Sequence, residues 1–265
     1  SVFFTNLTNE QLKELVVSLG EQEYRARQLQ HWVYQKLATS FDEMTDLPEG
    51  FRRKLVEKIK LPSLTLICHT VGQDSTVKAL FALSDGRTIE SVLMPHREGG
   101  QCRYTVCIST QVGCPIGCPF CATGQQGFER NLSAGEIIDQ VLYFARWLKE
   151  RGEVQPSPIS NLVFMGMGEP LANYANLWQA IEMLNSPQGF GLGARHMTVS
   201  TCGLVPQIKR LAREKLQIGL AVSLHASENT LRNRIVPINK RYPLGELISA
   251  GREYCEKTGR RLSFE

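Results

Sequence analysis

The chain has 265 residues, of which 42% are hydrophobic and 21% charged, and its formal net charge is +4. This length allows one large domain and a small one, and no apolar run approaches the roughly 20 residues of a membrane span. The first residues lack the basic region and cleavage site of a secretory signal. We therefore expect a cytoplasmic protein without a membrane partner, whose eight cysteines serve as reduced thiols for metal or redox chemistry.

The N-terminal part of the chain has helical periodicity. In three stretches of the first 60 residues, apolar side chains recur at the spacing of an amphipathic helix. Two β-rich runs follow, Val77–Leu83 and Thr88–Met94, and the Asp85-Gly86 pair between them is typical of a tight hairpin turn. We expect a small helical domain over residues 1–75, then a β-hairpin and a linker over residues 76–100.

From residue 101 onward, strands and helices alternate. The predicted strands are Tyr104–Ser109, Leu162–Met165, Met197–Ser200, Ile218–Leu224 and Arg261–Phe264. The predicted helices are Ser133–Arg151, which opens with a capping box, Tyr174–Asn185, Leu204–Glu214 and Leu244–Lys257. Repeated βα units predict an α/β domain with a parallel sheet over residues 101–265, either doubly wound or barrel-like. No helix follows the last strand, so we expect this domain to be incomplete at its C-terminal end.

The most informative segment is Cys114-Pro-Ile-Gly-Cys118-Pro-Phe-Cys121. Three thiolates at this spacing can ligate three irons of a [4Fe–4S] cluster and leave the fourth iron open. An open iron can chelate S-adenosylmethionine, and an electron from the cluster can then release a 5′-deoxyadenosyl radical. The alternative is zinc, but zinc sites usually combine four ligands in paired sets. Because no second pair stands at such spacing, the segment favours a radical enzyme.

Polar segments also stand at the ends of three successive predicted strands. They are Gly166–Pro170, Ser200–Gly203 and Ser223–His225. The carboxyl ends of parallel strands meet at one edge of a sheet, where ligands bind, and the Glu169 carboxylate could pair with an ammonium group. Each segment alone is typical of a structural turn, but together they favour a ligand site.

Basic side chains are most dense between Lys209 and Arg241. This stretch contains eight of them, namely Lys209, Arg210, Arg213, Lys215, Arg232, Arg234, Lys240 and Arg241. Such a surface would attract a phosphate-bearing partner. Solvated helix faces are the alternative interpretation.

With these motifs the chain resembles the radical S-adenosylmethionine methyltransferases of RNA, the RlmN and Cfr family, over nearly its whole length. The most specific block is CISTQVGCPIGCPFCATGQQGFERNL, from Cys107 to Leu132. Supporting blocks are Gly166–Leu171, Val199–Pro206, Ser223–Ala226 and Val236–Lys240. The resemblance is closer to RlmN than to Cfr. It implies a partial (β/α) barrel of the radical SAM type, with the helical N-terminal domain gripping RNA.

The resemblance also implies a reaction. The enzymes of this family use a [4Fe–4S] cluster and two molecules of S-adenosylmethionine, and they pass the methyl group through an S-methylcysteine. The expected target is carbon 2 of an adenine in 23S rRNA and in tRNA, with carbon 8, as in Cfr, the alternative. The expected protein partner is an electron donor such as flavodoxin or ferredoxin, and the chain is expected to be a monomer.

Carried over residue by residue, the resemblance assigns Cys114, Cys118 and Cys121 to the cluster. It makes Glu90 the general base and Cys107 the cysteine that resolves the protein–RNA adduct. Cofactor binding falls to Gly168, Glu169, Ser200, Ser223, Leu224 and His225. From the residues alone, Glu90 would be an exposed strand carboxylate and Cys107 a buried strand cysteine.

The other four cysteines, Cys68, Cys102, Cys202 and Cys255, are expected to be core thiols. The family's methyl-carrying cysteine and one cofactor-binding asparagine have no match in the chain, and we expect them beyond Glu265. Two other functions remain open from the residues: a different radical enzyme, such as a glycyl-radical activase or a methylthiotransferase, and a zinc-dependent RNA-binding module.

Overall fold

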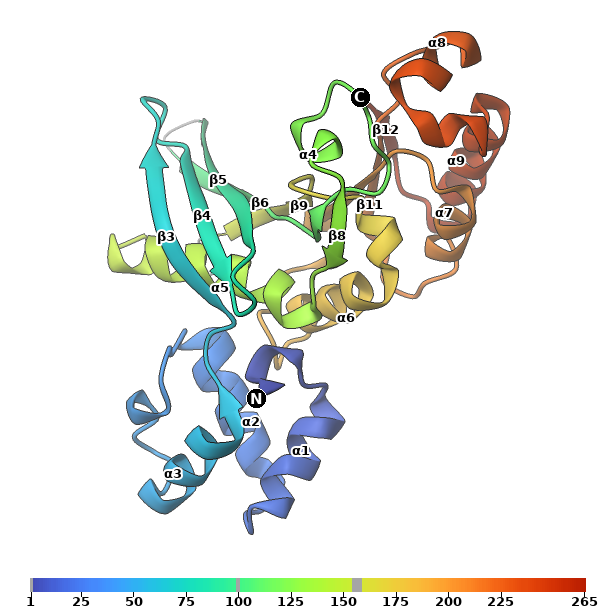
Figure 1. Ribbon diagram of the computed structural model, residues 1–265. Coiled ribbons are helices and arrows are strands. Elements are labelled where there is room, and N and C mark those ends of the chain that lie inside the picture. The colour runs from blue at the N-terminus through green and yellow to red at the C-terminus, as the bar shows by residue number, and fades with distance from the viewer. Residues whose placement is uncertain (1, 99–100, 154–158) are drawn as a thin grey trace.

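The computed structural model describes residues 2–98, 101–153 and 159–265 (Figure 1). Its centre is an eight-stranded sheet in the order β12-β11-β10-β9-β6-β5-β4-β3. The parallel part consists of β6 (Gln101–Cys107), β9 (Ile159–Phe164), β10 (Met197–Thr201), β11 (Gly219–Val222) and β12 (Leu262–Phe264). The antiparallel part continues from β6 through β5 (Thr88–Glu98), β4 (Val77–Leu83) and β3 (Leu64–Val71).

Four main helices connect the parallel strands and cover one side of the sheet (Figure 1). They are α5 (Ala134–Glu150), α6 (Tyr174–Asn185), α7 (Val205–Leu211) and α9 (Leu244–Thr258). The strand residues facing them are apolar and at most 1% exposed, namely Leu162, Phe164, Met197, Val199 and Leu220. Burial of these side chains between sheet and helices is the main source of stability in such a layer.

The other face of the sheet carries both polar and apolar side chains, and the strand register puts four predicted site residues on it. Cys107 of β6 lies opposite Val92 of β5, two residues after Glu90. The same register continues through β9 and β10 to β11, which puts Ser200 and Ser223 on this side. Because alternate residues of a strand point to opposite faces, these four side chains all point away from the helices.

The N-terminal domain contains α1 (Asn9–Ser18), α2 (Tyr24–Gln30) and α3 (Glu49–Lys58), with a short parallel pair of β1 (Val2–Phe3) and β2 (Ile59–Lys60). The buried carboxylate of Asp139 in α5 fastens this domain to the core. It accepts hydrogen bonds from Thr5 Oγ1 at 3.1 Å and from the Ser63 N–H at 2.7 Å. Asn6 Oδ1 adds a third contact by accepting the N–H of Gly135 at 2.7 Å.

Most predicted elements are confirmed, and three differences stand out. Residues 64–71 form strand β3 rather than part of a helical domain. The strand β5 runs through Glu98, so the predicted linker is strand up to that residue, and residues 99–100 lie outside the described part. The prediction of four core thiols is wrong for Cys68 and Cys102, which are exposed.

Helix α8 (Asn229–Ile235) was not predicted from the sequence. Within the described residues, no helix is both long and apolar enough to cross a membrane.

Candidate active site

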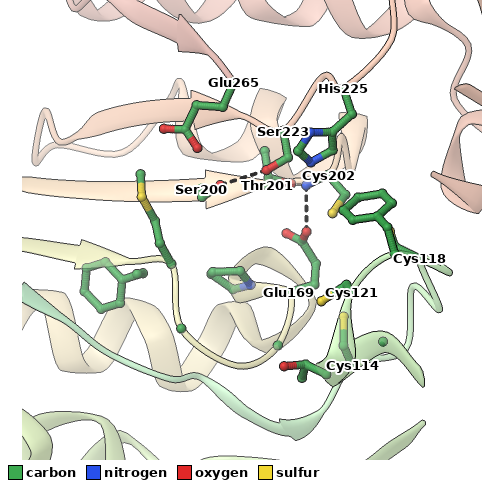
Figure 2. Close-up of a pocket in the computed structure, with 18 residues that line it drawn as sticks. Cys114, Cys118, Cys121, Glu169, Ser200, Thr201, Cys202, Ser223, His225 and Glu265 are labelled. Atoms are coloured by element: carbon green, nitrogen blue, oxygen red, sulfur yellow. Dashed lines mark hydrogen bonds between the residues drawn. The ribbon is translucent and has the colours of Figure 1, made fainter. Parts of the chain in front are cut away.

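A cavity of about 190 Å³ opens at the carboxyl ends of β9, β10 and β11 (Figure 2). Eight of the predicted site residues line it, namely Cys114, Cys118, Cys121, Gly168, Glu169, Ser200, Ser223 and His225. Figure 2 shows the three cysteines on one side, Glu169 next to them, and the two serines and His225 beyond. The structure thus gathers the CxxxCxxC loop and the ends of three strands around one space.

The cysteine loop is held between two short antiparallel strands, β7 (Gln111–Gly113) and β8 (Phe128–Asn131), and contains the single-turn helix α4 (Ala122–Gln125). The Cys114 N–H donates to the Gly127 carbonyl at 2.9 Å, which closes the loop at its base. Gly113 is required there, because its φ is +72° and a Cβ would lie 1.8 Å from the Gly127 oxygen. This closure fixes the start of the loop from which the cysteine side chains reach the cavity.

The thiols fit the ligand set of a cubane cluster. Among the described residues, no three His, Cys, Asp or Glu side chains are gathered closely enough to bind one metal ion. A cubane takes one thiolate for each of three irons, so its ligands surround the cluster instead of converging on a point. Cys118 is buried and Cys114 and Cys121 are half-buried, and all three line the same cavity.

Glu169 is a buried carboxylate at the cavity wall, 1% exposed. Its Oε2 accepts the Cys202 N–H at 2.7 Å and its Oε1 accepts the Leu171 N–H at 3.2 Å. Burial raises the pKa of Glu169, and these hydrogen bonds oppose the rise. A carboxylate held only by neutral donors can take a cationic group of a ligand as its partner.

The turn that carries Glu169 depends on Gly168. Its φ is +102°, and a Cβ there would lie 2.5 Å from the Cβ of Gln111. Gln111 in turn accepts the Glu169 N–H at 2.7 Å. The cysteine loop and the glycine-rich turn are therefore packed directly against each other.

The two serines and His225 form the opposite wall. Ser200 Oγ and Ser223 Oγ lie 3.2 Å apart. His225 is exposed, has a φ of 59°, and packs edge-on against Phe120 with ring centroids 4.9 Å apart. Leu224 is not among the residues that line the cavity. Its N–H donates to the Glu265 carbonyl at 2.8 Å, and its own carbonyl accepts from Arg232.

Glu90 and Cys107 lie outside this cavity. Glu90 lines a second cavity of about 700 Å³, which shares Thr123 with the first, and its carboxylate pairs with Lys78 Nζ at 2.9 Å. Cys107 ends β6, and burial raises its pKa to about 11. It is hydrogen-bonded with the backbone of Met165, which lines the first cavity.

Two residues have places at the site that differ from the sequence-based expectation for their side chains. Cys202, expected in the core, lines the cavity, and a hydrogen bond between its thiol and that of Cys118 lowers the pKa of Cys118 and raises that of Cys202. Arg232, expected on a basic surface, is 0% exposed and donates to carbonyls behind the cavity. The predicted ligand segment Ser200–Gly203 already included Cys202 by position, whereas no signal in the sequence indicated the place of Arg232.

The chain matches two family models. One is the ribosomal RNA large subunit methyltransferase N-terminal domain, over residues 4–61, and the other is the radical SAM superfamily, over residues 108–258. The crystal structure of a radical SAM methyltransferase from Sphaerobacter thermophilus has a TM-score of 0.93 and 46% identity, covering 100% of this chain and 75% of that one. The predicted fold of the radical SAM type is confirmed by this likeness.

Curated relatives agree with these matches. The chain is 52% identical over 259 residues to a probable dual-specificity RNA methyltransferase RlmN of Chloroflexus aurantiacus, covering 96% of this chain and 67% of the relative. It is 50% identical to the corresponding protein of Moorella thermoacetica, covering 98% and 73%. The dual-specificity RNA methyltransferase RlmN of Anaeromyxobacter dehalogenans is 48% identical, with 98% and 69% covered.

The superfamily and these relatives imply a [4Fe–4S] cluster and S-adenosylmethionine as cofactors, which agrees with the three thiols and the buried carboxylate at one cavity. A match over the helical N-terminal domain as well separates this chain from other radical enzymes. The chain therefore belongs to the RlmN family of radical SAM RNA methyltransferases.

Proposed function

We propose that this chain serves an enzyme that methylates carbon 2 of an adenine in 23S rRNA and in tRNA, by way of a methylated cysteine for which the chain itself has no matched residue. The observation that carries the proposal is the cavity in which the CxxxCxxC thiols face the buried Glu169. The names of the relatives, dual-specificity RNA methyltransferases, support RNA as the substrate. The N-terminal match to a ribosomal RNA methyltransferase domain supports an RNA-binding role for residues 4–61.

Each wall of the cavity has a proposed task. Cys114, Cys118 and Cys121 would ligate the cluster. Glu169, on the turn made possible by Gly168, would bind the cofactor's ammonium group. The Ser200 and Ser223 hydroxyls and His225 would bind its other polar groups, and Leu224, whose backbone groups are already hydrogen-bonded, would contribute by packing. With bound S-adenosylmethionine the cluster supplies the one-electron chemistry needed to attack an aromatic carbon, with the electron coming from a flavodoxin or ferredoxin.

The face of the sheet opposite the helices supports the roles proposed for Glu90 and Cys107. Both side chains point to the same side of the sheet as Ser200 and Ser223. Glu90 would accept a proton from the substrate, since its carboxylate is 44% exposed and next to a large cavity. Cys107, with a pKa of about 11, would remain a neutral thiol until it resolves the protein–RNA adduct.

Anaerobic reconstitution followed by iron analysis and product analysis tests the proposal. We expect about four irons per chain, and loss of the cluster in the Cys118→Ala variant. Methylated RNA fragments, digested to nucleosides and separated by liquid chromatography and mass spectrometry, should contain 2-methyladenosine. A product methylated at carbon 8 would refute the assigned position. One tightly bound zinc in place of the cluster would refute the proposed chemistry.

A further inference from the structure

Arg232 is a fully buried cation directly behind the cavity. It lies on α8, is 0% exposed, and makes four hydrogen bonds. Its Nε donates to the Leu224 carbonyl at 3.0 Å, and its Nη2 donates to the carbonyls of Cys202 at 2.7 Å and Ser223 at 3.2 Å. Its Nη1 donates to Asn239 Oδ1 at 2.8 Å. One guanidinium therefore joins the loop after β10 to the loop after β11.

These two loops carry the far wall of the cavity. The Cys202 carbonyl accepts from Arg232, while the N–H of the same residue donates to Glu169 Oε2. Ser223, whose carbonyl also accepts from Arg232, places its hydroxyl 3.2 Å from that of Ser200 (Figure 2). A planar fork that reaches three carbonyls at once is a geometry that arginine provides and lysine does not.

The charge of Arg232 has no carboxylate partner. All four acceptors are neutral oxygens, and none of the ion pairs found within 4.0 Å among residues 2–98, 101–153 and 159–265 involves this side chain. A buried charge without an opposite charge is costly. Burial lowers the pKa of Arg232, while the thiols of Cys202 and Cys118 raise it, so its field reaches the cysteine side of the cavity.

We propose that Arg232 is a positioning residue of the cofactor site. Its guanidinium group holds the backbone carbonyls of Cys202, Ser223 and Leu224 in place. Its positive charge offsets the negative charge that the cavity gains when the three thiolates bind an iron–sulfur cluster. The second role rests on the proposed function, because it requires the cluster. The first is a property of the protein alone.

Four variants of the reconstituted protein separate the two roles. Arg232→Gln removes the charge and most of the fork, whereas Arg232→Lys keeps the charge and loses the fork. Asn239→Asp keeps the guanidinium and puts a carboxylate beside it, and it also removes the hydrogen bonds that Asn239 Nδ2 donates to the Asn229 and Asn233 side chains. Arg234→Gln is the matched control, because Arg234 lies on the same helix but is exposed, so the same charge is removed outside the site.

Two measurements are needed: the reduction potential of the cluster, by a titration followed with electron paramagnetic resonance, and the affinity for S-adenosylmethionine, by anaerobic calorimetry. We expect Arg232→Gln to shift the potential to more negative values, since a nearby positive charge stabilises the reduced cluster. Asn239→Asp should shift it in the same direction. Arg232→Lys should keep the potential but weaken cofactor binding about tenfold, and Arg234→Gln should change neither quantity.

An unchanged potential in both Arg232→Gln and Asn239→Asp would overturn the charge role. If Arg232→Gln fails to fold, Asn239→Asp decides the question, because the guanidinium and its carbonyl contacts remain. Wild-type affinity in Arg232→Lys would overturn the positioning role. Absence of a cluster from the wild-type protein would instead refute the proposed function, and this outcome is distinguishable because it appears before any variant is compared.

Discussion

Cysteines outside the CxxxCxxC loop differ sharply in their surroundings. Cys107 is largely buried at the end of β6, and its pKa is raised to about 11, whereas Cys68 and Cys102 are exposed on β3 and β6. A thiolate, not a thiol, is the nucleophile toward alkylating reagents. At neutral pH, Cys107 is therefore protected both by its protonation and by its burial.

Alkylation followed by peptide mass spectrometry checks this difference. With iodoacetamide at about pH 7.5, we expect Cys68 and Cys102 to be modified well before Cys107. The rate at Cys107 should rise as the pH approaches its pKa of about 11, because the thiolate fraction grows. Equal rates at all three positions near neutral pH would contradict the burial of Cys107.

Glu90 allows catalytic and structural roles to be separated at one residue. Its carboxylate is 44% exposed and pairs with a Lys78 side chain that is 52% exposed, and exposed ion pairs add little stability. We expect Glu90→Gln to leave the melting temperature nearly unchanged while methylation falls by about 10²- to 10⁴-fold, the range for loss of a general base. Lys78→Met, which breaks the same ion pair, is the matched control, and comparable activity of the two variants would argue against a base.

The sequence predicted which residues line the cavity better than it predicted which neighbouring side chains are buried behind it. Ser200 is the last residue of a predicted strand, and Cys114 and Glu169 lie in the loops that follow two others. The strand ends of a parallel sheet meet by topology alone. Arg232 and Arg234 could not be told apart in this way. Both lie in a seven-residue helix, and only the packing of that helix over the loops after β10 and β11 makes one buried and the other exposed.

Among the elements, α5 shows how a local signal and tertiary burial combine. Ser133 caps it by accepting the Glu136 N–H at 3.2 Å, and Glu136 accepts the Ser133 N–H at 2.9 Å. Glu136 also pairs with Arg130 of β8 at 2.8 Å. The capping box therefore fixes the start of the helix next to the strand that closes the cysteine loop.

Removal of this cap should have a measurable effect. We expect Ser133→Ala to lower the free energy of unfolding by about 1 kcal/mol, as measured by urea denaturation. Ser133→Asp should restore most of the loss, since aspartate is also a good N-cap. No change in Ser133→Ala would indicate that Glu136 and Arg130 hold this end of the helix without the serine.

Elements with strong periodicity were predicted closely, and those without it were missed. Helix α6 has the predicted bounds, Tyr174–Asn185, because its apolar residues face the sheet at regular helical spacing. Strand β3 was missed because seven of its eight residues are exposed, among them the apolar Ile67 and Val71. Alternation between core and solvent, the usual signal of a strand, is absent there.

At the scale of the whole molecule, Asp139 connects the N-terminal domain to the core. It is fully buried, and burial raises its pKa, although hydrogen bonds from Ser63 and Thr5 oppose the rise. A folded-state pKa above the unfolded one means that the native protein binds the proton more tightly. The contribution of Asp139 to stability therefore falls as the pH rises from the unfolded pKa through the folded one.

Replacement by asparagine should remove this dependence. Asp139→Asn keeps an acceptor oxygen for the Ser63 N–H and cannot ionise. We expect the stability of the variant relative to the wild type to increase from about pH 4 to about pH 8, as measured by chemical denaturation at several pH values. A constant difference between the two proteins across this range would show that the folded and unfolded states bind the Asp139 proton equally, and would contradict a raised pKa in the folded state.

The basic stretch between Lys209 and Arg241 remains a candidate for RNA docking, but Arg232 does not belong to its exposed surface. Arg232 is buried, but Lys209, Arg210 and Arg213 are exposed, and with Pro206 and Glu214 they line one hollow at the C-terminal end of α7. Three cations around one hollow can bind neighbouring phosphates, which the sequence alone could not establish. Each phosphate that is bound releases counterions, so RNA affinity should fall steeply with salt concentration.

Charge reversal at two of these positions tests the docking surface. We expect Lys209→Glu combined with Arg213→Glu to weaken RNA binding and to lower the slope of log affinity against log salt by about 0.7 to 0.9 for each phosphate that the variant no longer binds. Cleavage of S-adenosylmethionine should be unaffected, because both residues lie outside the cofactor cavity. Arg252→Glu, at an exposed residue of α9, reverses one charge and controls for half of the change in net charge. An unchanged salt slope in the double variant would exclude this hollow and leave the N-terminal domain as the principal RNA-binding surface.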